Sequence, residues 1–177
     1  MIKLIEPQEK YMNGYEEAYL LSLAEINKGN ITMHDLMFDN PHEIDVIKKM
    51  INSSDQKKLP PHYVPSYYYF LVEEDKFLGV INIRIRLNDN LLNFGGHIGY
   101  GIHPKYWKQG YGTTILKLGL EKAKELVEND NVLITCDDDN IGSYKIIEKN
   151  GGTLENKIMN TVGEESFLTR RYWIKLR

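Results

Sequence analysis

The chain contains little cysteine and no long apolar run. Cys136 is its single cysteine, so no disulfide forms within the chain, and this usage is typical of a reducing compartment. No apolar stretch reaches the ~20 residues that a membrane-spanning helix needs. Glu6, Pro7 and Glu9 interrupt the N-terminal segment before the apolar core of a signal peptide is built. We therefore expect a cytoplasmic protein that has no membrane partner.

A strong excess of charge is also absent. The chain has 22 Lys and Arg against 25 Asp and Glu, which gives a formal net charge of -3. This balance lacks the overall positive field that attracts nucleic acid, so no nucleic-acid partner is expected. The spacing of Cys and His indicates no metal site. Hydrophobic residues make up 42% of the 177 residues, enough for one domain over residues 1–177.

The period of the hydrophobic pattern changes along the chain. Three- and four-residue steps predict helices, and alternation or short apolar runs predict strands. The predicted helices span residues 11–28, 41–53 with Asn40 as cap, a long segment after Gly112, and 140–149 with Asn140 as cap. The predicted strands span residues 67–73, 77–87, 94–103, 132–134, 152–160 and 165–176. This order favours a mixed α/β (α+β) fold over a pure sandwich or bundle.

The segment IHPKYWKQGYGTTIL, residues 102–116, joins a predicted strand to a predicted helix through two glycines. Helix N-termini carry free N–H groups and partial positive charge, and glycine lets phosphate oxygens approach the backbone. The amides near Gly110, Tyr111, Gly112 and Thr113 are therefore candidates to bind a pyrophosphate. The spacings of Walker and Rossmann loops are absent. The alternative is a glycine-rich turn without a ligand.

Residues 97–152 resemble the acyl-CoA-binding core of the GNAT superfamily of N-acetyltransferases. Gly110 and Gly112 match the family's [RQ]-x-x-G-x-[GA] loop, whereas Trp107 stands where Arg or Gln is usual. A second pattern, N-x-x-[AS]-x-x-x-x-E-K-x-G, is matched by Asn140, Ser143, Glu148, Lys149 and Gly151. The resemblance implies the GNAT fold: a central, mostly antiparallel sheet with a splayed parallel pair of strands, flanked by helices.

The same resemblance implies acetyl-CoA as co-substrate, with its pantetheine arm between the splayed strands. The implied contacts are Ile102, His103, Lys108, Gln109, Gly110, Tyr111, Gly112, Thr113, Asn140 and Ser143. Gly99 and Gly101 would allow the arm to approach the strand, or would mark a β-bulge.

Acetyl transfer to an amine needs a base for the amine and a proton for the leaving thiolate. His97 is the candidate base; a satisfied histidine at the rim of the site is the alternative. Many members of the family have a tyrosine that acts as the general acid at the position of Ile147. Because Ile147 cannot take this role, the candidate acids are Tyr144, one turn earlier, and Ser143. Tyr144 is otherwise a packing residue.

Two further groups of charged residues stay open to more than one interpretation. Asp137, Asp138 and Asp139 follow a predicted strand, where they relay a proton, attract a cationic amine, or form a solvated loop. Arg84 and Arg86 share one side of a predicted strand, where they hold a substrate carboxylate or face solvent.

The leading hypothesis is an N-acetyltransferase that moves an acetyl group from acetyl-CoA to a primary amine by direct attack in a ternary complex. The acceptor is a small-molecule or peptide amine, and the resemblance implies a possible homodimer. The second hypothesis is a non-catalytic module that binds acyl-CoA. Trp107 and Ile147, which depart from the family pattern, keep that second hypothesis open.

Overall fold

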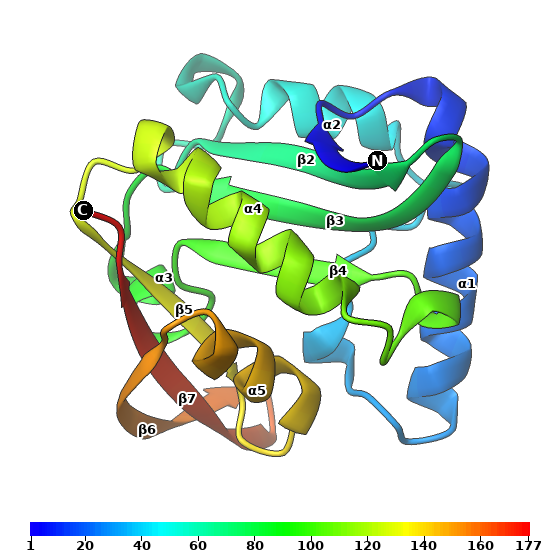
Figure 1. Ribbon diagram of the computed structural model, residues 1–177. Coiled ribbons are helices and arrows are strands. Elements are labelled where there is room, and N and C mark those ends of the chain that lie inside the picture. Colours follow the sequence, from blue (N-terminus) through cyan, green and yellow to red (C-terminus); the bar gives the residue numbers. More distant parts are fainter.

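In the computed structural model, which describes all 177 residues, the chain forms helices around two antiparallel sheets (Figure 1). The strands are β1 (Ile2–Ile5), β2 (Ser66–Glu73), β3 (Lys76–Arg84), β4 (Ile98–Ile102), β5 (Asn131–Asp137), β6 (Thr153–Val162) and β7 (Glu165–Lys175). The α-helices are α1 (Met12–Asn27), α2 (Val46–Asn52), α3 (Asp89–Asn93), α4 (Tyr111–Leu126) and α5 (Ile141–Lys149). None of these helices is long and apolar enough to cross a membrane.

The two sheets meet where β4 and β5 lie side by side. One sheet has the order β1-β2-β3-β4 and the other β5-β7-β6, and every pairing is antiparallel. The His97 N–H donates to the Leu133 carbonyl at 2.7 Å, just before β4 begins. From there β4 and β5 run in the same general direction and diverge (Figure 1). The mixed α/β fold and its splayed pair of strands are therefore confirmed.

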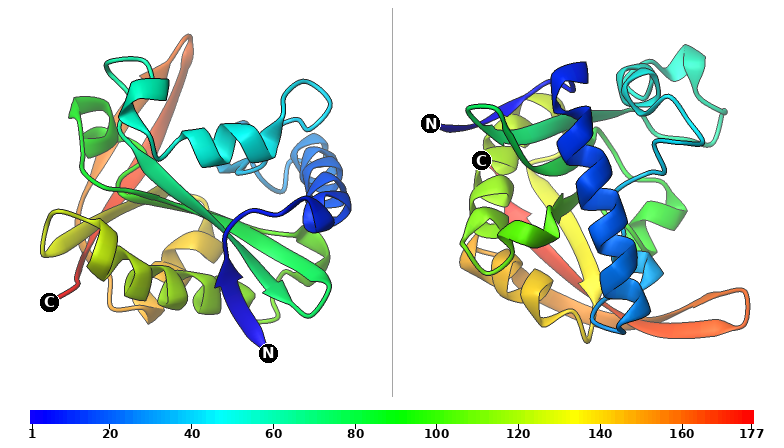
Figure 2. Two further views of the ribbon diagram at one scale, coloured as in Figure 1. Left: turned by 90° about the horizontal axis from the view of Figure 1, so that it is seen from above. Right: turned by 90° about the vertical axis from the view of Figure 1, so that its right-hand side faces the viewer.

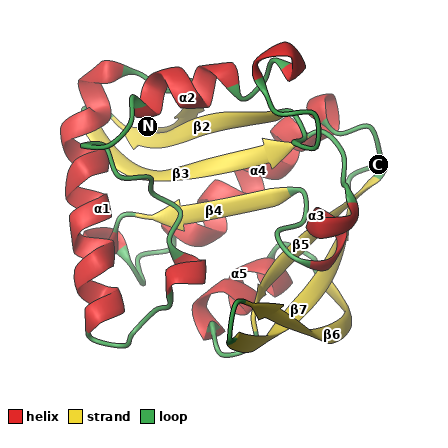
Figure 3. Cartoon of the chain, turned by 180° about the vertical axis from the view of Figure 1, so that it is seen from behind, coloured by secondary structure: helices red, strands yellow, loops and turns green.

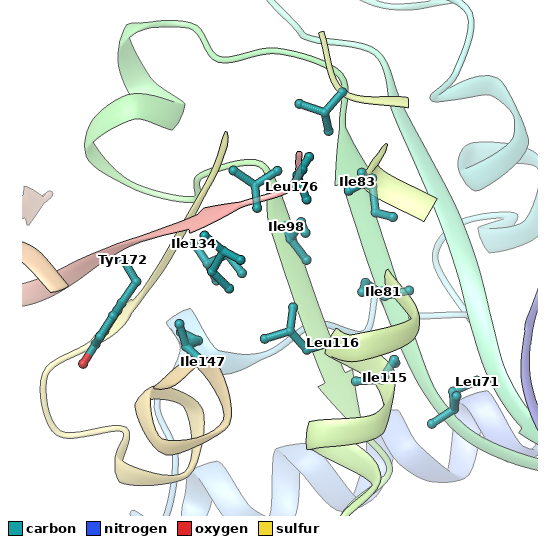
Figure 4. Packing of buried hydrophobic residues seen from close by; sticks show 14 of the residues in the cluster. Leu71, Ile81, Ile83, Ile98, Ile115, Leu116, Ile134, Ile147, Tyr172 and Leu176 are labelled. Carbon is teal, nitrogen blue, oxygen red and sulfur yellow. The ribbon is translucent and has the colours of Figure 1, made fainter. Parts of the chain in front are cut away.

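The helices cover both faces of the four-stranded sheet. Helix α4 lies on one face, whereas α1 and α2 lie on the other (Figures 2 and 3). On the α4 face, Ile81 and Ile83 pack with Ile115 and Leu116 in a cluster that also includes Tyr172 of the second sheet (Figure 4). The opposite face carries an aromatic cluster built from Tyr15, Phe38, Phe70 and Phe77. Strand β3 is buried on both faces from Phe77 to Ile83, Asn82 included, so its alternation of apolar and polar residues does not mark a face exposed to solvent.

One predicted helix begins later than the sequence pattern indicates. The helix expected from residue 41 begins at Val46, where Asp45 Oδ1 accepts from the Lys48 N–H at 2.9 Å. Asn40, the expected cap, accepts instead from the His42 N–H at 3.0 Å within a turn. Polar turn residues that precede a helix compete for its cap, so the first candidate is not always the one used.

The expected strands around residues 84–98 are shorter than predicted. Strand β3 ends at Arg84, and Asn88 caps the short helix α3 by accepting from the Leu91 N–H at 2.9 Å. Strand β4 begins only at Ile98. Strand β1, which pairs Ile2 with Glu73, was not predicted, because four residues are too few to show an alternating pattern.

Gly96 lies at the junction of the two sheets. Its φ of +60° is in the left-handed region, and a Cβ at this position would overlap the Leu133 carbonyl oxygen. Gly151 has a φ of +87° but no atom within 4 Å of the position of a Cβ. The two glycines therefore share the same backbone demand, and only Gly96 also needs the space.

We expect Gly96→Ala to lower the free energy of unfolding by about 1–3 kcal/mol more than the control Gly151→Ala, because only the first side chain meets backbone. Urea denaturation followed by tryptophan fluorescence measures both variants. Equal losses for the two variants would contradict the close packing of Gly96 against β5.

Candidate functional site

A cavity of about 710 Å³ opens where β4 and β5 diverge. Its lining comes from the end of α1 and the loop after it, from the end of β4, from the turn that leads into α4, and from the start of α5. Segments distant in the sequence therefore converge on one space. Of the residues predicted for the site, Ile102, Lys108, Gly112, Asn140 and Ser143 line this cavity.

The turn before α4 exposes a row of backbone amides. Lys108 and Gly110 have φ values of 61° and 88°, and α4 begins directly after them at Tyr111. The N–H groups of residues 108–113 donate to no acceptor in the protein. These amides and the positive end of a 16-residue helix therefore form a site suited to an anion.

The two glycines of this turn act in different ways. Nothing lies within 4 Å of the position of a Cβ on Gly110, so its role is the left-handed backbone. A Cβ on Gly112 would overlap the Ile146 side chain, so Gly112 allows α4 to approach α5. The sequence pattern marks both positions without separating these roles.

Other predicted residues of the turn contribute to its shape. Gln109 Nε2 donates to the Lys105 carbonyl at 3.2 Å, and the Tyr111 ring lies 6.0 Å from the Tyr106 ring. The Thr113 carbonyl accepts from Asn150 Nδ2 at 3.3 Å. The Gln109 and Tyr111 side chains and the Thr113 carbonyl therefore contact other parts of the protein, while the backbone N–H groups of these residues stay free.

Trp107, at the position where the family carries Arg or Gln, ties the turn to the end of β4. Its Nε1 donates to the Ile102 carbonyl at 2.8 Å, and both residues line the cavity. The indole thus fixes the position of the turn through a hydrogen bond to the protein backbone.

At the free edge of β4, the backbone N–H and carbonyl groups of every second residue point toward the cavity. The His103 N–H donates to the Leu78 carbonyl at 2.9 Å, so residues of the same parity bond to β3. The backbone groups of Tyr100 and Ile102 therefore point away from β3, toward β5. His103, one of the predicted contacts, is not among the lining residues. Its Nε2 lies 3.2 Å from Glu17 Oε2, and burial lowers its pKa.

Gly99 and Gly101 make room for the protein itself. A Cβ on Gly99 would lie 2.9 Å from Met37 Cε, and one on Gly101 would lie 2.7 Å from Met37 Cβ. The close approach that these glycines permit is that of the loop after α1, which crosses this face of the sheet. This explanation was not among the two that the sequence suggested.

The start of α5 brings two predicted polar residues to the cavity. Asn140 caps the helix, since its Oδ1 accepts from the Ser143 N–H at 3.0 Å. Its Nδ2 donates to Asp35 Oδ1 at 2.6 Å. The hydroxyl oxygen of Ser143 lies 3.2 Å from the Tyr100 hydroxyl, and both residues line the cavity.

Tyr100 is a polar residue of the cavity that the sequence interpretation missed. Its hydroxyl donates to the Ser143 carbonyl at 3.3 Å, and burial raises the pKa of the phenol. Tyr100 therefore remains an O–H donor at neutral pH. In the sequence pattern Tyr100 lies on the same side of the strand as Ile98 and Ile102, and only its hydrogen-bond partner on α5 distinguishes it from them.

The two other candidate catalytic residues lie outside the cavity lining. The Tyr144 ring stacks 3.9 Å from the Arg170 guanidinium and packs against the core. His97 is 1% exposed, and its Nδ1 accepts from the Leu133 N–H at 2.9 Å. Burial, with the nearby Arg84 guanidinium, lowers the pKa of His97 to about 4. His97 thus joins the two sheets as a neutral side chain.

The three consecutive aspartates occupy different environments. Asp137 is 7% exposed, and burial followed by the charge of Asp35 raises its pKa. Asp138 pairs with Lys157 at 2.7 Å and Arg170 at 2.6 Å, which lower its pKa. Asp139 lines the cavity.

Arg84 and Arg86 do not line this cavity. Arg84 donates to the carbonyls of Gly95 and Gly96, each at 3.1 Å, and burial lowers its pKa. Arg86 donates to Gln56 Oε1 at 3.1 Å. Both arginines hold loops of the protein. No group of three or more His, Cys, Asp or Glu side chains is arranged to hold a metal ion.

Comparison with known proteins relates this arrangement to one family. The family model for an acetyltransferase (GNAT) domain matches residues 16–153. No curated protein matches the chain in sequence.

Solved structures of low sequence identity share the fold. The microcin C7 self-immunity acetyltransferase MccE, in complex with acetyl-CoA and AMP, has a TM-score of 0.68 at 19% identity and covers 98% of this chain and 92% of its own. RimL, a ribosomal L7/L12 α-N-protein acetyltransferase, has a TM-score of 0.72 at 15% identity, with coverages of 98% and 90%. A GNAT-family acetyltransferase from Bacillus anthracis has a TM-score of 0.68 at 16% identity, with coverages of 99% and 95%.

The low pKa of His97 predicts a dependence of stability on pH. The unfolded chain binds this proton near pH ~6.5 and the folded chain only near pH 4, so stability is lost as pH falls between these values. His97→Asn keeps an acceptor for the Leu133 N–H and removes the titration. We expect urea denaturation at pH 7 and pH 4.5 to show a loss up to about 2 kcal/mol smaller in the variant. Parallel losses in both proteins would contradict this assignment.

Proposed function

The chain belongs to the GNAT family of acetyltransferases, and from that premise we propose that it transfers an acetyl group from acetyl-CoA to a primary amine. The observation that supports this most strongly is the row of unpartnered amides at residues 108–113, beside a cavity of about 710 Å³. When the anionic group of a ligand binds at the start of α4, the rest of the ligand lies next to the gap between β4 and β5.

In this proposal the backbone binds most of the co-substrate. The N–H groups of residues 108–113 donate to the pyrophosphate oxygens, and the Lys108 side chain adds positive charge. The Ile102 N–H and the backbone groups of Tyr100 pair with the amides of the pantetheine arm, in the manner of an added strand. The Ile102 carbonyl is already bonded to Trp107. Asn140 Nδ2 keeps a second N–H for the arm beyond its bond to Asp35.

Acetyl-CoA supplies a thioester, whose sulfur leaves as a thiolate that gains a proton. Ser143 is the proposed donor and Tyr100 its supporting residue, because both residues line the cavity and their hydroxyl oxygens lie 3.2 Å apart. When Tyr100 donates to the Ser143 hydroxyl oxygen, the Ser143 proton is free to point into the cavity. This pair takes the role that the sequence suggested for Tyr144 or Ser143.

Direct attack of the amine fits the side chains around the cavity. Burial raises the pKa of the Cys136 thiol to about 12, and Cys136 does not line the cavity, so it does not serve as a thiolate nucleophile. Ser143 has no histidine as hydrogen-bond partner. A ternary complex therefore explains transfer without a covalent enzyme intermediate.

The proposed acceptor is a small-molecule or peptide amine. RimL is an α-N-protein acetyltransferase of ribosomal L7/L12, which supports a peptide amine as one candidate acceptor. A homodimer stays a prediction.

The enzyme and the non-catalytic module are separated by two measurements on the same protein. We expect calorimetry to detect acetyl-CoA binding, and a thiol-release assay to detect turnover on at least one amine from a panel of N-terminal peptides, polyamines, amino acids and aminoglycosides. Binding without turnover on any amine would favour the module. Absence of binding would contradict both functions.

Thr113→Pro tests the row of amides directly. Thr113 is the third residue of α4, where the missing N–H leaves every helical hydrogen bond intact. We expect the variant to weaken coenzyme A binding by about tenfold, as for one lost charge-assisted hydrogen bond. Thr113→Ser, which keeps the N–H, is the matched control, and thermal melting checks the fold of both. Equal affinity of the two variants would argue against pyrophosphate binding by these amides.

A further inference from the structure

A chain of polar groups connects the cavity with the loop after α1 and the end of β5. Asp35 and Thr32 line the cavity, and Thr32 Oγ1 lies 3.0 Å from Asp35 Oδ2. The same hydroxyl oxygen lies 3.4 Å from Asp137 Oδ2. His34 Nδ1 lies 3.5 Å from that Asp137 oxygen. Carboxylate, hydroxyl, carboxylate and imidazole thus follow one another away from the cavity.

Local structure holds these groups in place. Thr32 and Asp35 form a capping box around the short 3-10 turn Met33–Asp35, since the Thr32 N–H donates to Asp35 Oδ2 at 2.8 Å. Asn140 Nδ2 donates to the other oxygen of Asp35 at 2.6 Å. The His34 ring packs against the Phe167 ring of β7 in a tilted arrangement, with ring centroids 4.0 Å apart. The cluster is therefore ordered on each side.

The charges of this cluster favour the binding of a cation and the uptake of a proton. Neither Asp35 nor Asp137 has a Lys or Arg partner, and the only basic group that pairs with either is His34. Burial and the charge of Asp35 raise the pKa of Asp137, so this carboxylate takes up a proton more readily than usual. Glu25 and Asp139 also line the cavity, against Lys108 alone among basic residues.

We propose that Asp35 contacts the acceptor's ammonium group and that the Asp137–His34 pair takes up its proton, with the Thr32 hydroxyl between them. This assignment rests on the proposed acetyl transfer. Asp35 is then a catalytic residue that touches the substrate. The ordered path explains how a base is supplied although His97 is buried away from the cavity.

The proton balance of the step is simple. The ammonium group gives one proton to the Asp137–His34 pair, and the neutral nitrogen then forms the C–N bond while the C–S bond breaks. The nitrogen loses its second proton as the amide forms, and the leaving thiolate gains a proton through the Ser143 hydroxyl or through water. Ser143 is reprotonated by the proton from the nitrogen, which thus ends on the coenzyme A thiol. The pair returns its proton to water, so one proton is released for each amide formed.

Few other charged groups face this pair. Asp35 and Asp139 act on Asp137 from the neighbouring loops. From the hairpin of β6 and β7, His34 meets the Phe167 ring, and Arg170 is already paired with Asp138. Phe94 adds a second apolar neighbour, because its ring centroid lies 6.0 Å from that of His34 and 5.4 Å from that of Phe167.

The test uses an amine that the wild-type protein acetylates. We expect His34→Gln and Asp137→Asn to lower kcat by about 100-fold while the dissociation constant for coenzyme A changes less than twofold. The acidic limb of the pH profile of kcat/KM flattens in both variants. Added imidazole restores part of the activity of His34→Gly, a rescue that a purely structural role does not show.

His42→Gln is the matched control, because His42 is an exposed histidine that pairs with Glu16 at 2.9 Å and does not line the cavity. It retains the wild-type rate and pH profile. Thermal melting identifies variants that fail to fold, and the rescue of His34→Gly remains decisive if Asp137→Asn is unstable.

The possible results distinguish the role of the Asp137–His34 pair from the proposed acetyl transfer. Wild-type kcat and pH profile in folded His34 variants would overturn the role of the pair and leave acetyl transfer standing. A wild-type protein that binds no coenzyme A or acetylates no amine would overturn the proposed function, and this role with it.

Discussion

The segment that leads into β4 is hydrogen-bonded to β5 near His97 and Leu133, and the site depends on the separation of the two strands beyond that point. The link has two parts, because the His97 backbone donates to Leu133 and the Leu133 N–H donates back to the imidazole. Gly96 leaves space for this crossing. Past it, the sheets diverge, and the unpaired edge of β4 becomes one wall of the cavity. A continuous sheet would satisfy these backbone groups and leave no room for a ligand.

The proposed binding and the proposed chemistry use different parts of the chain. The turn proposed to bind an anion is made of backbone, whose amides are free because a helix cannot satisfy its own first N–H groups. Its shape depends on two left-handed residues and on the bond from Trp107 to β4. The polar side chains come instead from α5 and from the loop after α1. This division explains why Trp107 in place of the usual Arg or Gln does not remove the proposed site. The proposed donors to the anion are backbone N–H groups, which do not depend on the side chain at this position.

Buried ionisable groups of this fold have two different roles. His97 and Arg84 are desolvated and bonded to backbone groups, so they act as structural links between loops and sheets. Asp137 is also buried, but its partners are a hydroxyl and an imidazole that lead to the cavity. Residue type alone does not distinguish these cases. His97, which the sequence made the candidate base, is a buried residue outside the cavity lining. His34, which lies in a segment without any motif, is next to the buried Asp137 carboxylate.

The sequence by itself determined the features that depend on neighbours a few residues apart. These are the glycine turn, the long helix after it, and the cap formed by Asn140, because backbone angles and helix caps follow from local chemistry. Tertiary structure alone decided which side chains face the cavity. Asp35 meets Asn140 across 105 residues of sequence, and Tyr100 meets Ser143 across 43. Such contacts depend on how sheets and loops pack, and no local pattern specifies that packing. The same reason turned Tyr144 and His97 away from the cavity, since a shift of one position on a helix or strand turns a side chain to another face.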